Sequence, residues 1–371
     1  MPDTKQLESF TAGVETAVDV AQIERQLGEL WQLAAESEKD PARRSVTRAC
    51  LCNFVVFCET DAARDHATDT ISTLTSRYPC RAIVLLVQPD APQAELSASI
   101  TAHCHLAGGG RKQVCCEQIA IHATGQSVAD LSGALLPLLE SDLPTIVWWQ
   151  GNFLKQPELL RRLSAVADRI LFDTAMWPEP ATQLAALART VAEASHCNFD
   201  DLSWTRLRLW RQLTAEFFDD PDCRAELERI ERLEITHGRG PGAGLRALLY
   251  AAWFAAQLGW PAAAGWSPAD ASRTIKVRAR DDSDATAVGI ISITLKSASA
   301  EFVIRKNYGE RTASAVVTMP NACGLPRKRA FWPTDDASLL SQELDHSARH
   351  TVYDRALAMA AALAERGAGR D

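Results

Sequence analysis

The residues best suited to hold an anion lie in one glycine-rich stretch, HGRGPGAGL, at positions 237–245. Gly240, Gly242 and Gly244 would leave backbone amides open to a ligand, and Arg239 would add a positive charge beside them. The spacing matches neither Gly-x-Gly-x-x-Gly nor a phosphate-binding loop, and the intervening proline has no amide hydrogen. The pattern therefore favours a flexible connector, with an anion loop as the alternative.

Nucleotide chemistry needs a glycine loop directly after the first strand of an α/β domain, because phosphate must approach bare backbone at a helix N-terminus. After the apolar run NFVVF the chain continues CETDAARDH, without a glycine. No Gly-x-Ser-x-Gly elbow occurs, and the eight histidines show no His-Glu-x-x-His spacing. We find no catalytic constellation and expect a protein that is not an enzyme and holds no cofactor.

Metal chemistry has one weak candidate, the group formed by His103, Cys104, His105, Cys115 and Cys116. Its residues do not form the two pairs that a zinc site usually shows, and a loop separates them. The ten cysteines of the chain have no regular spacing either, so a disulfide framework is disfavoured. We expect reduced structural thiols and no metal.

Tryptophan and arginine offer a different chemistry, that of protein contacts. The chain has ten tryptophans against four tyrosines, and tryptophan and arginine dominate interface hot spots. The predicted strand TIVWW ends in Trp148 and Trp149, and successive strand side chains point to opposite faces. Either both faces of this strand are covered, or one indole lies at a surface.

A second group of aromatic and basic residues follows in the helical pattern SWTRLRLWRQL. It contains Trp204, Arg206, Arg208, Trp210 and Arg211. The two tryptophans lie about 120° apart around a continuous helix, so one can be core while the other is exposed. We take both groups as candidates for binding a partner, with ordinary core packing as the alternative interpretation.

The elements that position these residues predict an α/β fold. Short apolar runs alternate with helix-like stretches in the first half, which indicates βαβ units and a parallel sheet. We expect an α/β domain over 1–200 preceded by an N-terminal helix, and a helical segment over 201–260. A small α+β domain over 261–371 would hold four antiparallel strands and a long C-terminal helix.

Composition narrows the range of partners. A net charge of −8 argues against binding to nucleic acid. The polar start MPDTKQLESF shows no secretory signal, and the longest weakly polar run, 245–260, is shorter than the roughly 20 residues of a membrane span. We expect a cytoplasmic protein that contacts neither nucleic acid nor membrane.

Several of these motifs, in their order along the chain, resemble the OpcA family of bacterial glucose-6-phosphate dehydrogenase assembly proteins. The resemblance runs over about residues 76–260 and rests on SRYPCRAIVLL, CCEQIAI, SDLPTIVWWQG, ADRILFDTA, DLSWTRLRLWRQLTAEFFD and LLYAAWFAAQLGW. The helix HTVYDRALAMA is similar to the C-terminal helix of the family. The most specific part is DLP-x-x-x-WW-x-G combined with DL-x-W-x-RL-x-x-WR.

The resemblance implies a non-enzymatic partner of glucose-6-phosphate dehydrogenase. Such a protein would act as an assembly factor or allosteric activator that promotes the active oligomer or conformation of the enzyme in the oxidative pentose phosphate pathway. Two alternatives stay open: a sugar-phosphate enzyme of the same pathway, such as a lactonase, and a catalytically inactive α/β protein that senses a metabolite.

Overall fold

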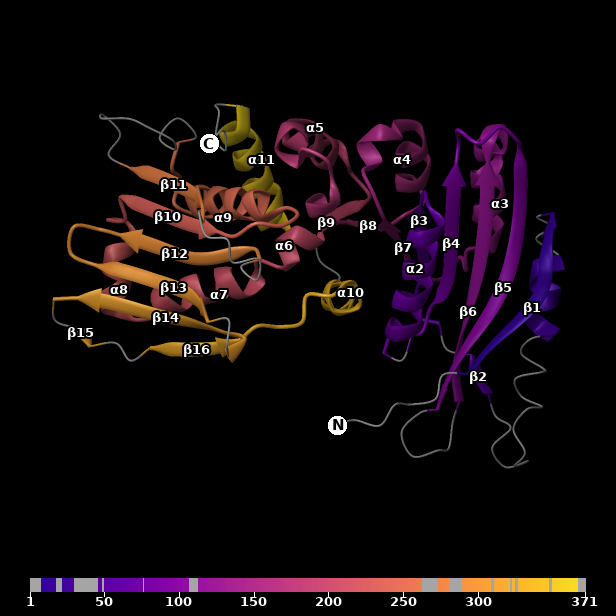
Figure 1. Ribbon diagram of the computed structural model, residues 1–371, viewed down its shortest axis with the longest axis horizontal. Coiled ribbons are helices and arrows are strands. Elements are labelled where there is room, and N and C mark those ends of the chain that lie inside the picture. The colour runs from indigo at the N-terminus through magenta and orange to yellow at the C-terminus, as the bar shows by residue number, and fades with distance from the viewer. Residues whose placement is uncertain are drawn as a thin grey trace. The chain divides into compact units, whose positions relative to one another are not determined.

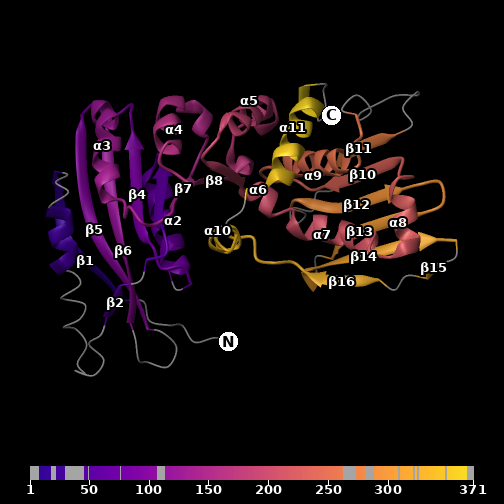
Figure 2. The same ribbon diagram turned by 180° about the vertical axis from the view of Figure 1, so that it is seen from behind.

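The chain folds into two compact units. The computed structural model describes residues 8–17, 22–29, 46–48, 50–75, 77–106, 113–261, 273–280, 288–307, 310–320, 322–323, 326–346 and 349–365. The first unit comprises Met1–Phe172, His196–Phe199 and Asp335–Ser347. The second comprises Asp173–Ser195, Asp200–Thr334 and Ala348–Asp371. Figures 1 and 2 show the elements of both units from opposite sides.

A largely parallel sheet forms the first unit. Its order is β1-β5-β6-β4-β3-β7-β8-β9, with β2 beside β6. Strand β3 pairs in parallel with β4 and β7, and β5 pairs antiparallel with β6 and β1. The strands are β1 (Glu8–Ala17), β2 (Val46–Arg48), β3 (Asn53–Cys58), β4 (Arg81–Gln88), β5 (Glu95–Leu106), β6 (Gln113–Thr124), β7 (Thr145–Trp149), β8 (Arg169–Phe172) and β9 (Asn198–Asp201).

The first unit also contains helical elements besides the helical residues 22–29. The described ones are α2 (Asp61–Leu74), η2 (Gly125–Asp130), α3 (Leu131–Leu135), η3 (Leu136–Leu138), η4 (Phe153–Lys155), α4 (Pro157–Ser164) and α10 (Asp336–Leu344). All residues of β3, β7 and β8 are buried, as is typical of a parallel sheet covered on both faces. The expected α/β fold is therefore confirmed.

The first unit also contains strands that the sequence analysis missed. Strand β5 lies in the interval between β4 and β6, where we expected no element, and it pairs with β6 from Glu95↔Thr124 to Leu106↔Gln113. Its sequence, ELSASITAHCHL, is dominated by small and polar residues, so its apolar periodicity is weak. Near the N-terminus, residues 22–29 are helical as expected, and β1 precedes them.

The second unit contains a mixed sheet. Its order is β11-β10-β12-β13-β14-β15, with β16 also pairing with β14. The strands are β10 (Arg232–His237), β11 (Thr274–Ala279), β12 (Ile290–Lys296), β13 (Glu301–Asn307), β14 (Thr312–Met319), β15 (Ala322–Cys323) and β16 (Arg327–Ala330). The helices are η5 (Thr174–Met176), α5 (Pro180–Glu193), α6 (Leu202–Thr205), α7 (Arg208–Phe217), α8 (Pro221–Leu227), α9 (Ala243–Gln257) and α11 (Thr351–Glu365). In Figure 1, α9 and α11 lie side by side.

The expected antiparallel arrangement of the four strands after residue 261 is partly wrong. Strand β10, from the stretch predicted to be helical, lies between β11 and β12, and it pairs in parallel with β11 and antiparallel with β12. As a result, residues 201–260 fall in the same compact unit as the antiparallel strands. We expected residues 201–260 and 261–371 to form separate parts of the chain, so this division differs from the expected one.

The long C-terminal helix is interrupted. Helix α10 ends at Leu344 and α11 begins at Thr351, where we expected one continuous helix. The guanidinium of Arg169 donates hydrogen bonds to the backbone carbonyls of Glu343 and His346, at and just after the end of α10. Among the described helices, none is both long and apolar enough to cross a bilayer.

Candidate functional site

Trp148 and Trp149 belong to the core of the first unit, with 3% and 1% of their surfaces exposed. The Trp149 ring lies 4.2 Å from that of Phe57 and 6.1 Å from that of Phe153, while Trp148 lies edge-on to His66 at 6.1 Å. Both indoles are buried because β7 has β3 and β8 at its sides and both faces of the sheet are covered. Of the two alternatives for this strand, the structure has the one in which both faces are covered.

Trp204 and Trp210 are also buried, within the second unit. Trp204 packs 5.5 Å from the Tyr353 ring, and Trp210 packs 5.7 Å from the Phe331 ring. The chain between them is not one helix, because α6 ends at Thr205 and α7 begins at Arg208. The 120° argument therefore fails, and neither indole is the exposed member of a pair.

The three arginines of this segment are partly exposed. Arg206 forms an ion pair with Asp173, with Nη1 2.7 Å from Oδ2. The Arg211 guanidinium lies 3.6 Å from the centroid of the Trp204 ring. The Arg208 guanidinium lies 4.9 Å from the centroid of Trp332. Partner binding by these arginines stays a prediction.

Trp332 is the exposed tryptophan that the sequence analysis missed, with 41% of its surface accessible. It follows β16, whose residues are all exposed and which pairs with one side of β14. We define the β16 surface as Arg208, Arg327, Lys328, Arg329 and Trp332. The signal was available in the sequence as RKRAFW, three basic residues followed closely by two aromatic ones.

A buried capping network fixes the start of α6. The Asp201 side chain accepts hydrogen bonds from the Ser203 amide at 2.9 Å and from the Thr174 hydroxyl at 2.6 Å. The Ser203 hydroxyl donates to Asp173 at 2.8 Å. Burial, followed by the neighbouring charge of Asp173, raises the pKa of Asp201 to about 7. The aspartate and serine of the DLSW motif are therefore structural groups that hold η5 against α6.

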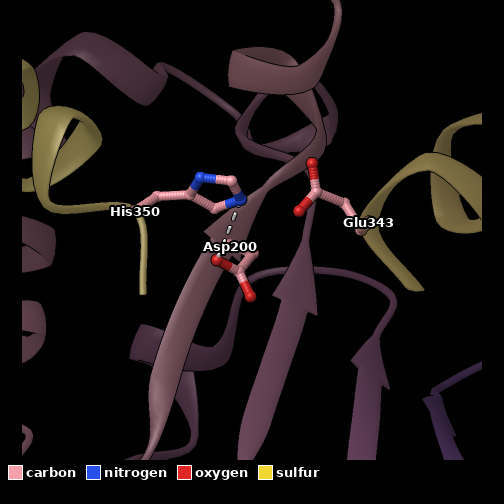
Figure 3. Close-up of side chains that lie close together, drawn as sticks. All are labelled: Asp200, Glu343 and His350. Atoms are coloured by element: carbon pink, nitrogen blue, oxygen red, sulfur yellow. Dashed lines mark ion pairs between the residues drawn. The ribbon is translucent and has the colours of Figure 1, made fainter. Parts of the chain in front are cut away.

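A second acidic residue of this region forms an ion pair with a histidine. Within the second unit, His350 Nε2 lies 3.8 Å from Oδ1 of the buried Asp200, as the dashed line in Figure 3 marks. Asp200 is one of the last two residues of β9, which belong to the second unit, and His350 immediately precedes α11. The pair therefore connects the start of the C-terminal helix to the end of β9.

The glycine-rich stretch forms an ordered turn between β10 and α9. Gly240 and Gly242 have φ angles of 106° and 64°, values that disfavour any residue with a side chain. Gly242 is the N-cap of α9 and offers no side chain to bond the free amides of the first turn. Arg239 and Gly244 are exposed at the same end of the helix. The residues proposed for an anion loop thus surround one helix N-terminus.

A cleft of the first unit lies at the carboxyl ends of its parallel strands. It has a volume of about 880 Å³, and its lining includes Glu59, Gln88, Asp90, Lys155, Glu158 and Arg162. Ligands of open α/β sheets bind at this edge. Glu59 stands directly after β3, where a dinucleotide-binding fold has its glycine loop, and it accepts a hydrogen bond from Gln156. Its carboxylate would repel a phosphate there.

The cysteines with described side chains are reduced: Cys50, Cys52, Cys58, Cys80, Cys197 and Cys223. Burial raises the pKa of Cys58 to about 12, which keeps the thiol protonated and unreactive. In the weak metal candidate, the β5–β6 register pairs His103 with Cys116 and Cys104 with Cys115. The side chains of these four residues lie outside the described part of the chain.

Comparison with known proteins finds a family whose models match this chain. A family model described as a glucose-6-phosphate dehydrogenase subunit N-terminal domain matches residues 71–189, and the corresponding C-terminal domain matches residues 197–357. The chain is 31% identical over 189 residues to the putative OxPP cycle protein OpcA of Synechocystis sp.. It is 33% identical over 186 residues to the Nostoc punctiforme protein of the same name.

These alignments cover 51% and 50% of this chain but only 39% of each relative, so the chain spans well under half of their length. Among solved structures, a dehydrogenase from Chromobacterium violaceum is similar at 12% identity and a TM-score of 0.47, covering 86% of this chain and 94% of that one.

Proposed function

Because the chain belongs to the OpcA family of glucose-6-phosphate dehydrogenase assembly proteins, we propose that it binds glucose-6-phosphate dehydrogenase and promotes the active oligomer or conformation of that enzyme. The observation that carries this proposal is the match of both family models, which fall on residues 71–189 and 197–357. The role belongs to the oxidative pentose phosphate pathway, which the names of the relatives include.

Activation by such a partner requires differential binding. A protein can shift the dehydrogenase only if it binds the active state more tightly than the inactive one. Couplings between binding sites amount typically to about 1–3 kcal/mol, which corresponds to a roughly 5- to 150-fold change in affinity. Where the KM of the dehydrogenase for glucose 6-phosphate reflects substrate binding, we expect this protein to lower the apparent KM by a factor within that range.

The β16 surface is our candidate for the contact. An exposed indole beside a guanidinium combines a large apolar area with directed polar groups, which is the composition of interface hot spots. Arg327, Lys328 and Arg329 add positive charge along an exposed strand, although Lys328 and Arg329 also lie near Glu310 and Glu216. An acidic patch on the dehydrogenase would complement this surface.

The remaining predicted contact residues then have two roles. Arg206 and Arg211 stay partner-contact candidates, since both are partly exposed. Trp148, Trp149, Trp204 and Trp210 would act through the packing that positions these surfaces, because they are buried. A cytoplasmic location and the lack of a reaction of its own stay predictions from the sequence.

The test is the initial rate of the cognate dehydrogenase against glucose 6-phosphate, with and without this protein. We expect a lower apparent KM or a higher kcat, and no turnover by this protein alone. Unchanged kinetics at saturating protein, together with no complex in analytical ultracentrifugation, would contradict the proposal. A complex without a change in kinetics would retain binding and exclude activation.

A further inference from the structure

We propose that the second unit binds a small oxyanion, the phosphate group of a phosphate monoester such as a sugar phosphate, at the N-terminus of α9 between the Gly240–Gly242 turn and the guanidinium of Arg246. This site is additional to the contact with the dehydrogenase. Its evidence consists of the helix terminus, a buried guanidinium beside it, and the charges around both.

The helix terminus presents free amide donors. Helix α9 is 15 residues long, and its N-cap, Gly242, makes no side-chain hydrogen bond. The Ala243 amide bonds the Gly240 carbonyl, and the Arg246 amide bonds the Gly242 carbonyl. The amides of Gly244 and Leu245 make no backbone hydrogen bond within the described part of the chain. First-turn amides and the helix dipole together favour an anion.

Arg246 is the second, independent observation. Only 7% of its surface is exposed, and no described residue forms a hydrogen bond or ion pair with its guanidinium. Its Nη1 lies 3.1 Å from the position that a Cβ would take at Gly242, and its Nη2 lies 3.7 Å from the corresponding position at Gly289. The guanidinium therefore lies against the glycine turn. A buried cation without a partner is costly, and a bound anion would compensate its charge.

The neighbouring charged residues do not compensate the positive charge of Arg246. Burial, and then the neighbouring Arg206, lower the pKa of Arg246, whereas Asp173 and Asp201 act in the opposite direction. Asp173 is already paired with Arg206. Asp201 accepts hydrogen bonds from its own neighbours, and its raised pKa reduces its negative charge near neutral pH.

A lysine and a histidine ring also lie nearby. Burial, and then the charge of Arg246, lower the pKa of Lys306, whose Nζ donates to the Val288 carbonyl at 3.3 Å. His237 Nε2 lies 3.7 Å from the position that a Cβ would take at Gly244. The surroundings of the turn are therefore positive overall, as a phosphate site requires.

Geometry restricts the ligand to a small group. A Cβ at Gly242 would lie 2.5 Å from the Ala175 side chain, so one side of the turn is closed by η5. Gly240 and Gly244 are exposed, which leaves the other side open to solvent. One phosphate can enter from that side. The turn lacks the longer cradle that a di- or triphosphate needs.

The experiment measures binding without any dehydrogenase, so its result is separate from the proposed activation. Thermal unfolding and hydrogen exchange of the full chain are recorded with inorganic phosphate, glucose 6-phosphate or glucose, at constant ionic strength set with chloride. We expect phosphate and glucose 6-phosphate to raise Tm and to protect the amides of residues 240–246, and glucose to do neither. A response to glucose 6-phosphate alone would show that the site also binds the sugar.

Two variants locate the effect. Arg246→Met keeps most of the side-chain volume and should weaken phosphate binding at least tenfold, whereas Arg229→Met, at an exposed arginine of the same unit, should bind like the wild type. No protection of residues 240–246 in the wild-type chain would overturn the proposal, even if Arg246→Met does not fold. Equal phosphate binding by folded Arg246→Met would overturn it as well.

Discussion

The guanidinium of Arg208 lies 4.9 Å from the centroid of the Trp332 indole, and the two residues come from positions 124 apart along the chain. Arg208 begins α7, and Trp332 follows the exposed strand β16. Their contact places the one described tryptophan with a large exposed area beside a cation that can direct a partner. Trp332 is therefore exposed, whereas Trp148, Trp149, Trp204 and Trp210 are buried.

Trp332→Ala should weaken binding to glucose-6-phosphate dehydrogenase with little effect on folding. Truncation of an interface hot spot costs about 2 kcal/mol or more, so we expect at least a tenfold higher Kd by surface plasmon resonance. Leu51→Ala, which shortens an exposed apolar residue of the first unit, serves as the control and should leave Kd unchanged. An unaltered Kd for Trp332→Ala would remove Trp332 from the contact.

Trp149→Ala should destabilise the first unit by about 3–5 kcal/mol, because it leaves a cavity in a packed core. Urea unfolding followed by circular dichroism measures the change. Trp149→Phe, which retains an aromatic ring beside Phe57, should cost less. If the alanine variant kept wild-type stability but lost dehydrogenase binding, Trp149 would be a contact residue after all.

The buried pair of Arg169 and Glu343 should be strongly coupled. The two side chains are 7% and 5% exposed, and Arg169 Nη2 lies 3.2 Å from Glu343 Oε2. Arg169→Met alone should cost about 3–5 kcal/mol, because it leaves a carboxylate buried without its cation. The double variant with Glu343→Leu should be less destabilised than the sum of the two single variants. Additive free energies of unfolding would contradict this coupling.

The stability of the second unit should fall as pH rises from about 4 to about 7. Asp201 has a pKa of about 7 in the folded chain and about 3.9 when unfolded, so the folded state holds the extra proton across that window. The slope from one such group reaches at most about 1.4 kcal/mol per pH unit.

Unfolding free energies of the wild type and Asp201→Asn between pH 5 and pH 8 isolate this contribution. The variant should be less stable overall but show a flatter pH dependence, since other groups titrate equally in both chains. Asp219→Asn, at an exposed position of the same unit, should retain the wild-type slope. Parallel curves for the wild type and Asp201→Asn would show that Asp201 does not titrate in this range.

Gly242→Ala should lower Tm, whereas Gly244→Ala should not. A Cβ at residue 242 would overlap Ala175 at 2.5 Å and would require a φ of 64°. At residue 244 a Cβ meets only the His237 ring, at an ordinary 3.7 Å. We expect the free energy of unfolding of Gly242→Ala to fall by more than about 1 kcal/mol, because the steric overlap with Ala175 and the backbone strain at a positive φ add. Differential scanning calorimetry measures the Tm of both variants. Equal Tm values for Gly242→Ala and Gly244→Ala would contradict the close packing of the turn on η5.

The sequence alone determined the main features of this protein. Continuous apolar runs such as RAIVLLV predicted the buried parallel strands, because a strand covered on both faces needs no polar alternation. The order of the tryptophan- and arginine-containing motifs indicated the family. The N-cap of α6 is also a local feature, because the Asp201 side chain accepts a hydrogen bond from the amide only two residues later.

Tertiary structure decided what depends on residues far apart in the chain. Whether Trp148 and Trp149 are exposed depends on what covers each face of β7, and their own periodicity carries no information on that. The C-terminal helix is interrupted where a guanidinium 174 residues earlier in the chain bonds the last carbonyls of α10. Strand β10 lies in a stretch predicted to be helical, and its partners, β11 and β12, lie some 40 to 60 residues later in the chain. Local pattern predicts an element, but burial, pairing and exposure follow from the contacts that the folded chain brings together.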